Sequence, residues 1–289
     1  MNERIFFKVM VVITEKMKTL HVNEQQLDDA MEEIRYAHTI KSLSTCRTSN
    51  LNYGQLNYRC AYLFRHFTCI AVVTRRMWHR FYSANNEISF AIDLLMAQGS
   101  VNVCSIGGGP ATDLLGFYMF LTLNYDISHV QINGVILEKH IQWMDMFAPL
   151  RQLFNRSNNM ANVKYSFFDF FDTPGVNAVK AIASADVVSI VKFLSAVGYD
   201  RNKSERKIEV LLKSVGHGVP VFFMDNSGGG YMRSMENAAR NAQFRLIAKI
   251  EHKQMRVPCG EKIEMDRWNQ YFVLNPQKNP CVSAAVWIR

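Results

Sequence analysis

The sequence predicts an α/β fold: a doubly wound, mainly parallel seven-stranded sheet with an antiparallel C-terminal hairpin, preceded by an N-terminal helical extension. Two observations lead to this prediction. Short segments rich in Val and Ile alternate with amphipathic segments between about residues 100 and 225, which is the order of βαβ units. One of these apolar segments also runs into three consecutive glycines, Gly107 to Gly109, and then directly into a helical pattern.

The strand, glycine turn and helix around residues 101–123 form the centre of the predicted fold. Val101, Val103 and Ile106 are typical of a buried strand, and the glycines can take backbone angles that other residues avoid. Pro110 suits the first position of the following helix, predicted over 111–123. Such a turn exposes backbone N–H groups at a helix start, so we expect a ligand site at the carboxyl end of the central strand.

The N-terminal part is predicted to be helical and to pack, not to react. Helices are expected over residues 3–20 and 23–43, followed by a polar break at 44–50 and a long helix from within 51–58 to about 82. A shorter helix over 87–97 leads to the central strand. We therefore expect an N-terminal helical extension or lid over 1–84 and a ligand-binding domain over 85–289.

Further strands are expected at 131–137, 163–168, 185–191 and 220–224, with helices at 139–154 and 206–215. Right-handed crossovers between them place helices on both faces of the sheet. The strand-like segments 244–251 and 282–288 have no clear helix between them in the sequence, so they are expected to pair as an antiparallel hairpin at the sheet edge.

Composition narrows the cell compartment and the ligand classes. A formal charge of +8 and a pI near 9.2 favour an anionic partner. Six cysteines without a C-x-x-C pair indicate reduced thiols and an intracellular protein, cytoplasmic or nuclear. The apolar run 5–13 is interrupted by Lys8 and is predicted to be neither a signal peptide nor a membrane span. No cluster has metal-ligand spacing, so no metal is expected.

The ordered motifs over residues 85–289 resemble those of class I S-adenosylmethionine-dependent methyltransferases, which have a Rossmann-like fold. Residues 103–110 look like the glycine loop of that family, and Glu138 matches the acidic residue that binds the ribose hydroxyls. Residues 168–170 resemble the adenine-contacting motif, and 186–193 resemble the fourth-strand motif. The resemblance implies S-adenosyl-L-methionine as cofactor, held by Ile106, Gly107, Gly108, Gly109, Asp113, Glu138, Lys139, Asp169, Phe170, Lys192 and Phe193.

Elementary chemistry excludes a dinucleotide at the same turn. A G-x-G-x-x-G site needs a third glycine, but Thr112 occupies that position. Glu138 can accept hydrogen bonds from vicinal hydroxyls and would repel a phosphorylated ribose. Alternatives stay open for each acid: Glu138 as an ordinary helix-start carboxylate, Asp169 or Asp172 as a cap, and Asp113 as a cap or a partner of the cofactor's ammonium group.

Lys192 is the candidate catalytic residue. As a structural lysine it would extend to water from the strand end. If it is desolvated beside a sulfonium, its pKa should fall, and it could then act as a base for a ring nitrogen or hydroxyl. The stretch 191–197 lacks the Asn/Asp-Pro-Pro-Tyr/Phe pattern of enzymes that methylate exocyclic amines, and it lacks a Pro-Cys pair for covalent attack.

The acceptor is less defined, and three functions stay open. The first is methylation of RNA at a base nitrogen or hydroxyl, guided by a basic helix face, since residues 59–62 and 192–197 distantly resemble eukaryotic ribosomal-RNA uridine-N3 methyltransferases. The second is methylation of a small molecule at N or O, and the third is a catalytically silent interaction protein. The basic face comprises Arg65, Arg76, His79 and Arg80, and the candidate substrate-binding residues are Tyr53, Tyr58, Arg59, Tyr62 and Asn226.

Overall fold

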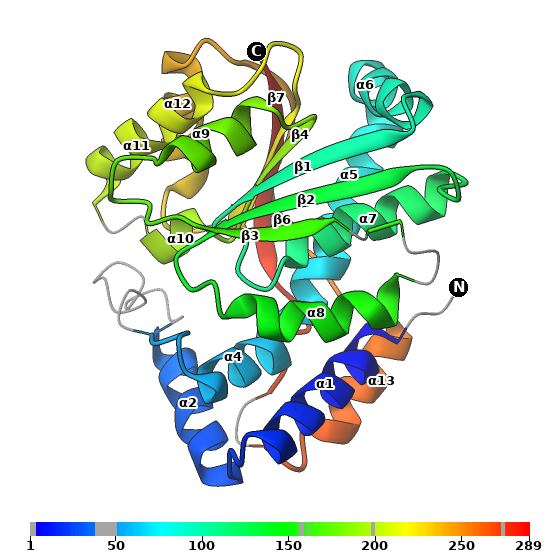
Figure 1. The fold of residues 1–289 in the computed structure, drawn as a ribbon, viewed down its shortest axis with the longest axis vertical. Helices are drawn as coiled ribbons and strands as arrows, with labels where there is room; N and C mark the ends of the chain where they lie inside the picture. Colours follow the sequence, from blue (N-terminus) through cyan, green and yellow to red (C-terminus); the bar gives the residue numbers. More distant parts are fainter. Residues whose placement is uncertain (1–3, 38–50, 156–158, 161, 198–199, 273–274) are drawn as a thin grey trace.

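A seven-stranded mixed sheet forms the centre of the molecule, as the sequence predicted (Figure 1). The computed structural model describes residues 4–37, 51–155, 159–160, 162–197, 200–272 and 275–289. The strand order is β3-β2-β1-β4-β5-β7-β6. Strands β1 to β5 are parallel, whereas β7 pairs antiparallel with both β5 and β6. This is the doubly wound, Rossmann-like arrangement with an antiparallel C-terminal pair.

The strands are β1 (Ser100–Ile106), β2 (Gln131–Glu138), β3 (Val163–Phe167), β4 (Val187–Val191), β5 (Val221–Asn226), β6 (Arg245–Gln254) and β7 (Cys281–Ile288). The first helices are α1 (Ile5–Thr19), α2 (Glu24–Ala37), α4 (Leu56–Tyr62), the π-helical turn η2 (Leu63–Phe67), α5 (Thr68–Ala84) and α6 (Asn86–Ala97). The others are α7 (Thr112–Asn124), α8 (Trp143–Phe154), α9 (Val176–Ala183), α10 (Leu194–Val197), α11 (Arg201–Lys213), α12 (Tyr231–Asn241) and α13 (Cys259–Trp268).

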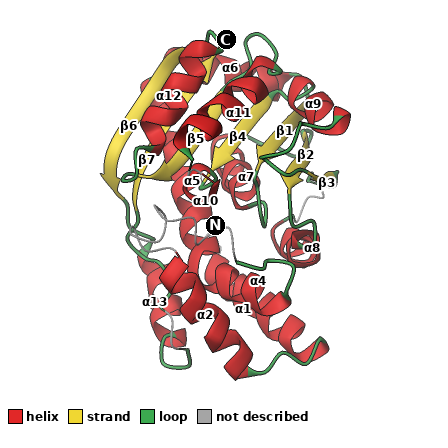
Figure 2. Ribbon diagram, turned by 90° about the vertical axis from the view of Figure 1, so that its left-hand side faces the viewer, coloured by secondary structure: helices red, strands yellow, loops and turns green. Residues whose placement is uncertain are grey.

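Helices cover both faces of the sheet because successive strand residues point to opposite sides. Phe222 and Met224 of β5 belong to the core beneath α5, α7 and α8. Phe223 between them belongs to the second core, beneath α9, α11 and α12. This alternation produces the three layers visible in Figures 1 and 2.

Helix α5 belongs to the sheet layer although it precedes residue 85. Its Trp78 stacks on Phe222 of β5, with ring centroids 4.7 Å apart. Gly116 of α7 permits a close crossing, because a Cβ there would lie 2.6 Å from Thr74 Cβ and 2.8 Å from the Ala71 carbonyl oxygen. The described contacts thus join α5 to the ligand-binding domain, and the division at residue 84 stays a prediction.

A second group of helices, α1, α2, α4 and α13, lies at one end of the sheet (Figures 1 and 2). Helix α13 corrects the expectation that no helix separates the last two strands, because it lies between β6 and β7. Its sequence, Cys259 to Trp268, lacks a clear apolar stripe, so periodicity could not identify it.

Other boundaries also differ from the predictions. Pro110 is not the first helical residue: α7 begins at Thr112, after Ala111 takes a left-handed conformation with φ 57°. Helix α8 begins at Trp143, not at Lys139. Helices α9 and α12 were not predicted. The end of the predicted helix 23–43 and the polar break 44–50 lie partly or wholly outside the described residues.

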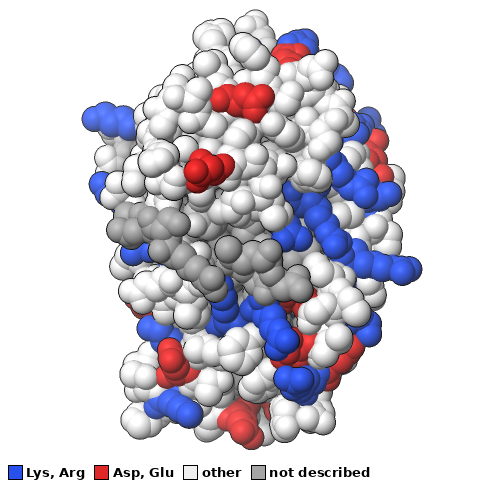
Figure 3. All heavy atoms as spheres, turned by 90° about the vertical axis from the view of Figure 1, so that its right-hand side faces the viewer, with Lys and Arg blue, Asp and Glu red and all other residues white. Residues whose placement is uncertain are grey.

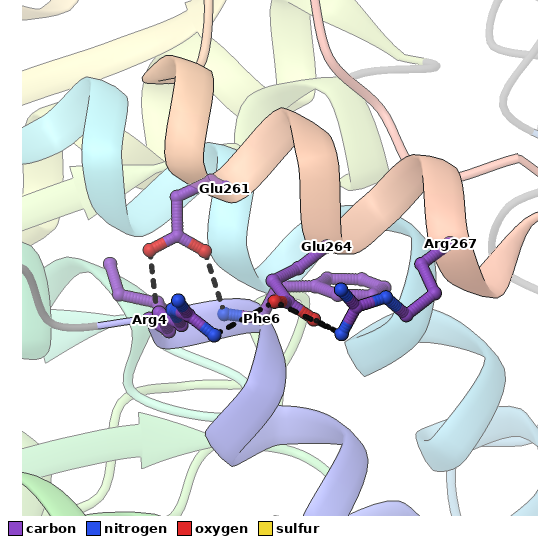
Figure 4. A network of polar contacts seen from close by, with 6 residues as sticks. Arg4, Phe6, Glu261, Glu264 and Arg267 are labelled. Atoms are coloured by element: carbon purple, nitrogen blue, oxygen red, sulfur yellow. Dashed lines mark hydrogen bonds and ion pairs between the residues drawn. The ribbon is translucent and has the colours of Figure 1, made fainter.

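Glu261 of α13 joins the N-terminal helix α1 to the segment between β6 and β7 (Figure 4). This segment, residues 255–280, is called the C-terminal insertion below. Its buried carboxylate accepts hydrogen bonds from the N–H groups of Ile5 and Phe6, at 2.7 and 2.9 Å. These are the first amides of α1, which have no partner inside their own helix. The neighbouring Glu264 pairs with Arg4 at 3.1 Å. A residue from near the end of the chain therefore caps its first helix.

We predict that Glu261→Ala destabilises the protein by about 1–2 kcal/mol, because two helix-start amides lose their acceptor. Urea unfolding measures the change. Lys262→Ala is the matched control, since Lys262 is exposed on the same helix and pairs only with Asp266. A Glu261→Ala protein as stable as the control would contradict the capping role.

Candidate active site

A cavity of about 550 Å³ opens at the carboxyl ends of the parallel strands. It is lined by residues from the glycine turn, the ends of β2, β4 and β5, the segment after β3, and helices α4, η2, α5 and α8. The predicted residues that line it are Gly107, Gly108, Gly109, Asp113, Glu138, Lys139, Asp169, Phe170, Lys192, Phe193, Tyr53, Tyr62 and Asn226. Ile106 is buried in the sheet and is not among the lining residues.

The glycine turn has the predicted backbone conformation, but its amides are used differently. Gly107 and Gly109 have φ of 64° and 48°, where L-residues are strained. The Gly107 N–H donates to the Leu137 carbonyl at 2.8 Å, and the Gly109 N–H donates to Glu138 Oε2 at 3.0 Å. The Ala111 N–H is bonded to the Gly108 carbonyl. These three amides are therefore not directed at a phosphate, contrary to the expected exposure.

Glu138 is fixed at the end of β2 by backbone donors. Its Oε1 accepts the His140 N–H at 3.0 Å, while its Oε2 holds the glycine turn. Burial raises the pKa of this carboxyl above its ordinary value, and the amides of His140 and Gly109 offset part of that rise. Each oxygen retains a second lone pair for a hydroxyl donor.

Asp113 is a buried carboxylate without an ion-pair partner among the described residues. It is 3% exposed and lines the cavity, and its polar neighbours are the hydroxyls of Ser189 and Ser105 and the N–H of Leu114. Burial raises its pKa, although the hydroxyls of Ser189 and Ser105 lie near enough to lower it in part. An unpaired buried carboxylate is costly, so this position favours a cationic or hydrogen-bond-donating ligand.

Asp169 follows β3 and lines the cavity, where two contacts hold its carboxylate. Its Oδ2 pairs with Lys139 Nζ at 2.8 Å, and its Oδ1 accepts the Phe171 N–H at 3.1 Å. Burial alone would raise the pKa of Asp169, but these two contacts hold it below its ordinary value. Phe170 and Phe193 meet edge to face, with centroids 5.0 Å apart, and form an apolar wall beside the pair.

Lys192 lies in a strained conformation at the end of β4. Its φ of 56° is left-handed, which costs a non-glycine residue on the order of 1–3 kcal/mol. Its Nζ donates to Asn226 Oδ1 at the end of β5. Burial lowers the pKa of this ammonium, and buried Asp225 opposes that shift. The sequence analysis did not identify Asp225, which accepts the N–H groups of Ser195 and Asn226.

Aromatic side chains form the wall opposite the glycine turn. The Tyr53 ring centroid lies 5.6 Å from that of Tyr62 and 5.3 Å from that of Trp143, and His140 lies on the other side of Tyr53. Burial raises the pKa of the Tyr62 hydroxyl, with further contributions from Glu138, Asp225 and Asp113.

The π-helical turn η2 directs two further residues into the cavity. The Arg65 carbonyl accepts the Gln277 N–H at 2.8 Å, and Arg65 Nη1 donates to the Asn275 carbonyl at 2.7 Å. His66 Nδ1 lies 3.1 Å from Gln277 Oε1. Because an amide oxygen only accepts, this hydrogen bond places a proton on Nδ1.

His66, Trp143, His140 and Gln277 were not predicted as site residues. Gln277 reaches the cavity from a segment 211 positions after His66. No local sequence pattern reports such a contact. The π-helical turn Leu63–Phe67 is a structural feature that is frequent at functional sites, but the sequence does not reveal it.

Two predicted substrate residues lie outside the cavity. Tyr58 donates to Glu33 of α2, and buried Arg59 donates to the carbonyls of Tyr53 and Gly54, both at 2.8 Å. Arg59 thereby holds the loop that carries Tyr53.

The four residues of the predicted basic face do not form one surface. Arg65 lines the cavity, Arg76 donates to the Arg256 carbonyl, and His79 and Arg80 are exposed. Figure 3 shows a band of Lys and Arg side chains across the middle of one face.

Within the part of the chain that the structure describes, no helix has the length and apolar character that a membrane crossing requires. No group of three or more His, Cys, Asp or Glu among those residues is arranged to hold a metal ion.

No protein-family model matches the chain, and no curated protein matches it in sequence. Solved structures match in fold. The chain is similar to an O-methyltransferase family protein from Burkholderia thailandensis, with 11% identity and a TM-score of 0.45, over 88% of this chain and 63% of that one. It is similar to an S-adenosylmethionine-dependent methyltransferase from Methanosarcina mazei, with 7% identity and a TM-score of 0.44, over 66% and 93%.

A third similar structure, from Pyrococcus horikoshii, is described as a candidate RNA methyltransferase. It has 12% identity and a TM-score of 0.41, over 70% of this chain and 82% of that one. The neighbours are thus methyltransferases by description.

Proposed function

We propose that this protein is an S-adenosylmethionine-dependent methyltransferase. The main support is a set of buried carboxylates at the cavity. Glu138 and Asp113 line the cavity, and Asp225 lies beside Lys192. Burial raises the pKa of all three carboxyls, so their negative charge is costly without a cation. A ligand with an ammonium group, a sulfonium and two ribose hydroxyls matches this donor set.

The residues present fit this cofactor better than a phosphate-bearing one. Glu138 has lone pairs for the two ribose hydroxyls, and Asp113 supplies an unpaired carboxylate for the ammonium group. Phe170 and Phe193 provide an apolar wall for a flat base. A pyrophosphate would meet Glu138 and an inward-bonded glycine turn, both of which disfavour it.

The remaining part of the cavity would hold the acceptor. When bound, S-adenosylmethionine supplies an electrophilic methyl group, so these residues only need to align a nucleophile and take its proton. Lys192 and His66 are the candidate proton acceptors. Tyr53, Tyr62 and Trp143 form an aromatic wall, which suits a flat acceptor such as an RNA base or a small aromatic molecule.

Calorimetric titration with S-adenosylmethionine and with its demethylated product tests the proposed function. Wild-type protein should bind both, and Glu138→Gln should bind about 10- to 100-fold more weakly, since a hydrogen bond to a charged group contributes about 1.5–3 kcal/mol. Asp172→Asn is the matched control, because Asp172 is exposed and does not line the cavity. Absence of binding by the wild type would overturn the function.

Cofactor affinity should fall as pH falls. The raised pKa values of Asp113 and Glu138 mean that these carboxyls take up protons above their ordinary values of 3.8 and 4.5. A bound cation favours the ionised forms, so binding releases protons, and affinity is lost as pH drops through the raised values. Titrations in buffers of different ionisation enthalpy measure this release. An affinity that stays constant down to pH 4.5, the ordinary pKa of a Glu carboxyl, would contradict the carboxylate roles.

Lys192→Met should keep cofactor affinity within about twofold but reduce methyl transfer by about 10²-fold or more, the usual contribution of a general base. The assay follows labelled methyl from the cofactor into cell extract, and nuclease treatment and size separation then distinguish RNA from small acceptors. The exposed Lys180→Met is the control. Full turnover by Lys192→Met would exclude Lys192 as the base.

A further inference from the structure

A surface groove lies between α11 and the segment that follows β3. It is lined by Thr173, Pro174, Asp200, Asn202, Lys203, Arg206, Lys207 and Val210. Arg201, exposed at the start of α11, is adjacent in sequence to these residues. We propose that this groove binds the phosphodiester backbone of a single-stranded RNA acceptor. The inference rests on the proposed function, because it names the acceptor of that same site.

The cations of the groove are held by neutral partners. Lys203 Nζ lies 4.8 Å above the centre of the Phe171 ring, and Lys207 Nζ donates to the Asp172 carbonyl at 2.7 Å. Arg201 Nη2 donates to the Gly229 carbonyl at 2.9 Å. Arg206 is exposed and makes no hydrogen bond or ion pair with any described residue. These contacts orient positive charge without neutralising it.

Several cations elsewhere on the described surface are paired with carboxylates. Lys213 pairs with Glu209 at the far end of the same helix, Lys262 with Asp266, and Arg245 with Glu87. In the groove, the carboxylates of Asp172 and Asp200 accompany four cations, and Asp200 already accepts the Lys203 N–H. This region therefore has a local excess of positive charge.

The groove borders the cavity. Phe171, which supports Lys203, also lines the cavity. Arg201 contacts the glycine loop that follows Asn226, another cavity residue: a Cβ on Gly230 would lie 3.3 Å from the Arg201 guanidinium. Lys203 and Arg201 of α11 therefore lie next to Phe171 and the 229–230 loop, beside the cavity. A nucleic acid strand along the groove could place one unstacked base against the aromatic wall of Tyr53, Tyr62 and Trp143.

The groove is more positive than the cavity. The cavity lining has three cations, Arg65, Lys139 and Lys192, beside three carboxylates, Asp113, Glu138 and Asp169. The groove lining has Lys203, Arg206 and Lys207 with one carboxylate, Asp200, so a phosphate is attracted more strongly to the groove. An acceptor that carries its charge on a backbone and its nucleophile on a neutral ring satisfies both regions. A free anionic metabolite of cavity size would have to bring its charge inside.

Fluorescence anisotropy with a short labelled single-stranded RNA of mixed sequence tests the groove. The triple variant Lys203→Glu, Arg206→Glu, Lys207→Glu should bind RNA at least about tenfold more weakly than wild type. The dependence of log affinity on log salt should become shallower by about 0.7 for each phosphate contact that is lost. Cofactor affinity and the unfolding midpoint should stay unchanged, because these side chains lie outside the cavity.

A matched control makes the same change in net charge elsewhere: Lys213→Glu, Arg245→Glu, Lys262→Glu, each at an ion-paired surface position. Its RNA affinity should fall by much less than that of the groove variant. The milder triple Lys203→Gln, Arg206→Gln, Lys207→Gln replaces the first variant if charge reversal impairs folding. Vesicles containing phosphatidylserine test whether the groove prefers a membrane surface.

Three results would overturn the inference: no RNA binding by wild type, equal losses in the groove and control variants, or tighter binding to the vesicles than to RNA. Each can occur while the wild type still binds S-adenosylmethionine, which would leave the proposed function intact. If the wild type bound RNA but not the cofactor, the proposed function would fail, and the acceptor role of the groove with it.

Discussion

The carboxylate of Glu138 is the contact on which the candidate site depends. It ends β2, holds the N–H of Gly109 and the N–H of His140, and so fixes the glycine turn against the start of the next segment. The turn in turn places Asp113 at the first helical residues of α7. Because the turn bonds inward, the site presents oxygen acceptors where a phosphate-binding turn presents amide donors. Oxygen acceptors favour a ligand that donates hydrogen bonds over one that carries a phosphate.

The cavity and the groove on α11 differ in charge: the cavity lining combines carboxylates with cations, whereas the groove lining is mainly basic. Buried acids at the cavity raise the pKa of Tyr62, while the cations on α11 contact carbonyl groups and a ring. The net charge of +8 therefore does not describe the charge of the cavity itself. The sequence analysis placed the basic surface on the helix that includes Arg65 and Arg76, yet both donate to backbone carbonyls of the C-terminal insertion.

The meeting of the glycine turn with Glu138 and Asp169 could be predicted because these residues follow successive strands in order along the chain. Parallel strands bring their carboxyl ends together, so a glycine turn, Glu138 and Asp169 at three strand ends must meet. Helix α13 could not be predicted, since its residues lack amphipathic periodicity and its start is marked only by Pro258. Tyr58 and Arg59 were predicted to bind substrate, but the helix turns them toward α2 and the 53–54 loop.

The acceptor half depends on contacts between distant segments. The π-helical turn leaves the Arg65 carbonyl for the Gln277 amide, and the same segment orients His66, so one wall is assembled from positions 211 residues apart. That segment follows α13, whose Glu261 caps α1. The first helix, the insertion and the π-helical turn are thus linked by hydrogen bonds. A change in the length or anchoring of this segment would alter the wall formed by His66 and Gln277 without touching Glu138 or the glycine turn. Local motifs therefore define the part of the cavity around Glu138, whereas the opposite wall depends on the tertiary structure.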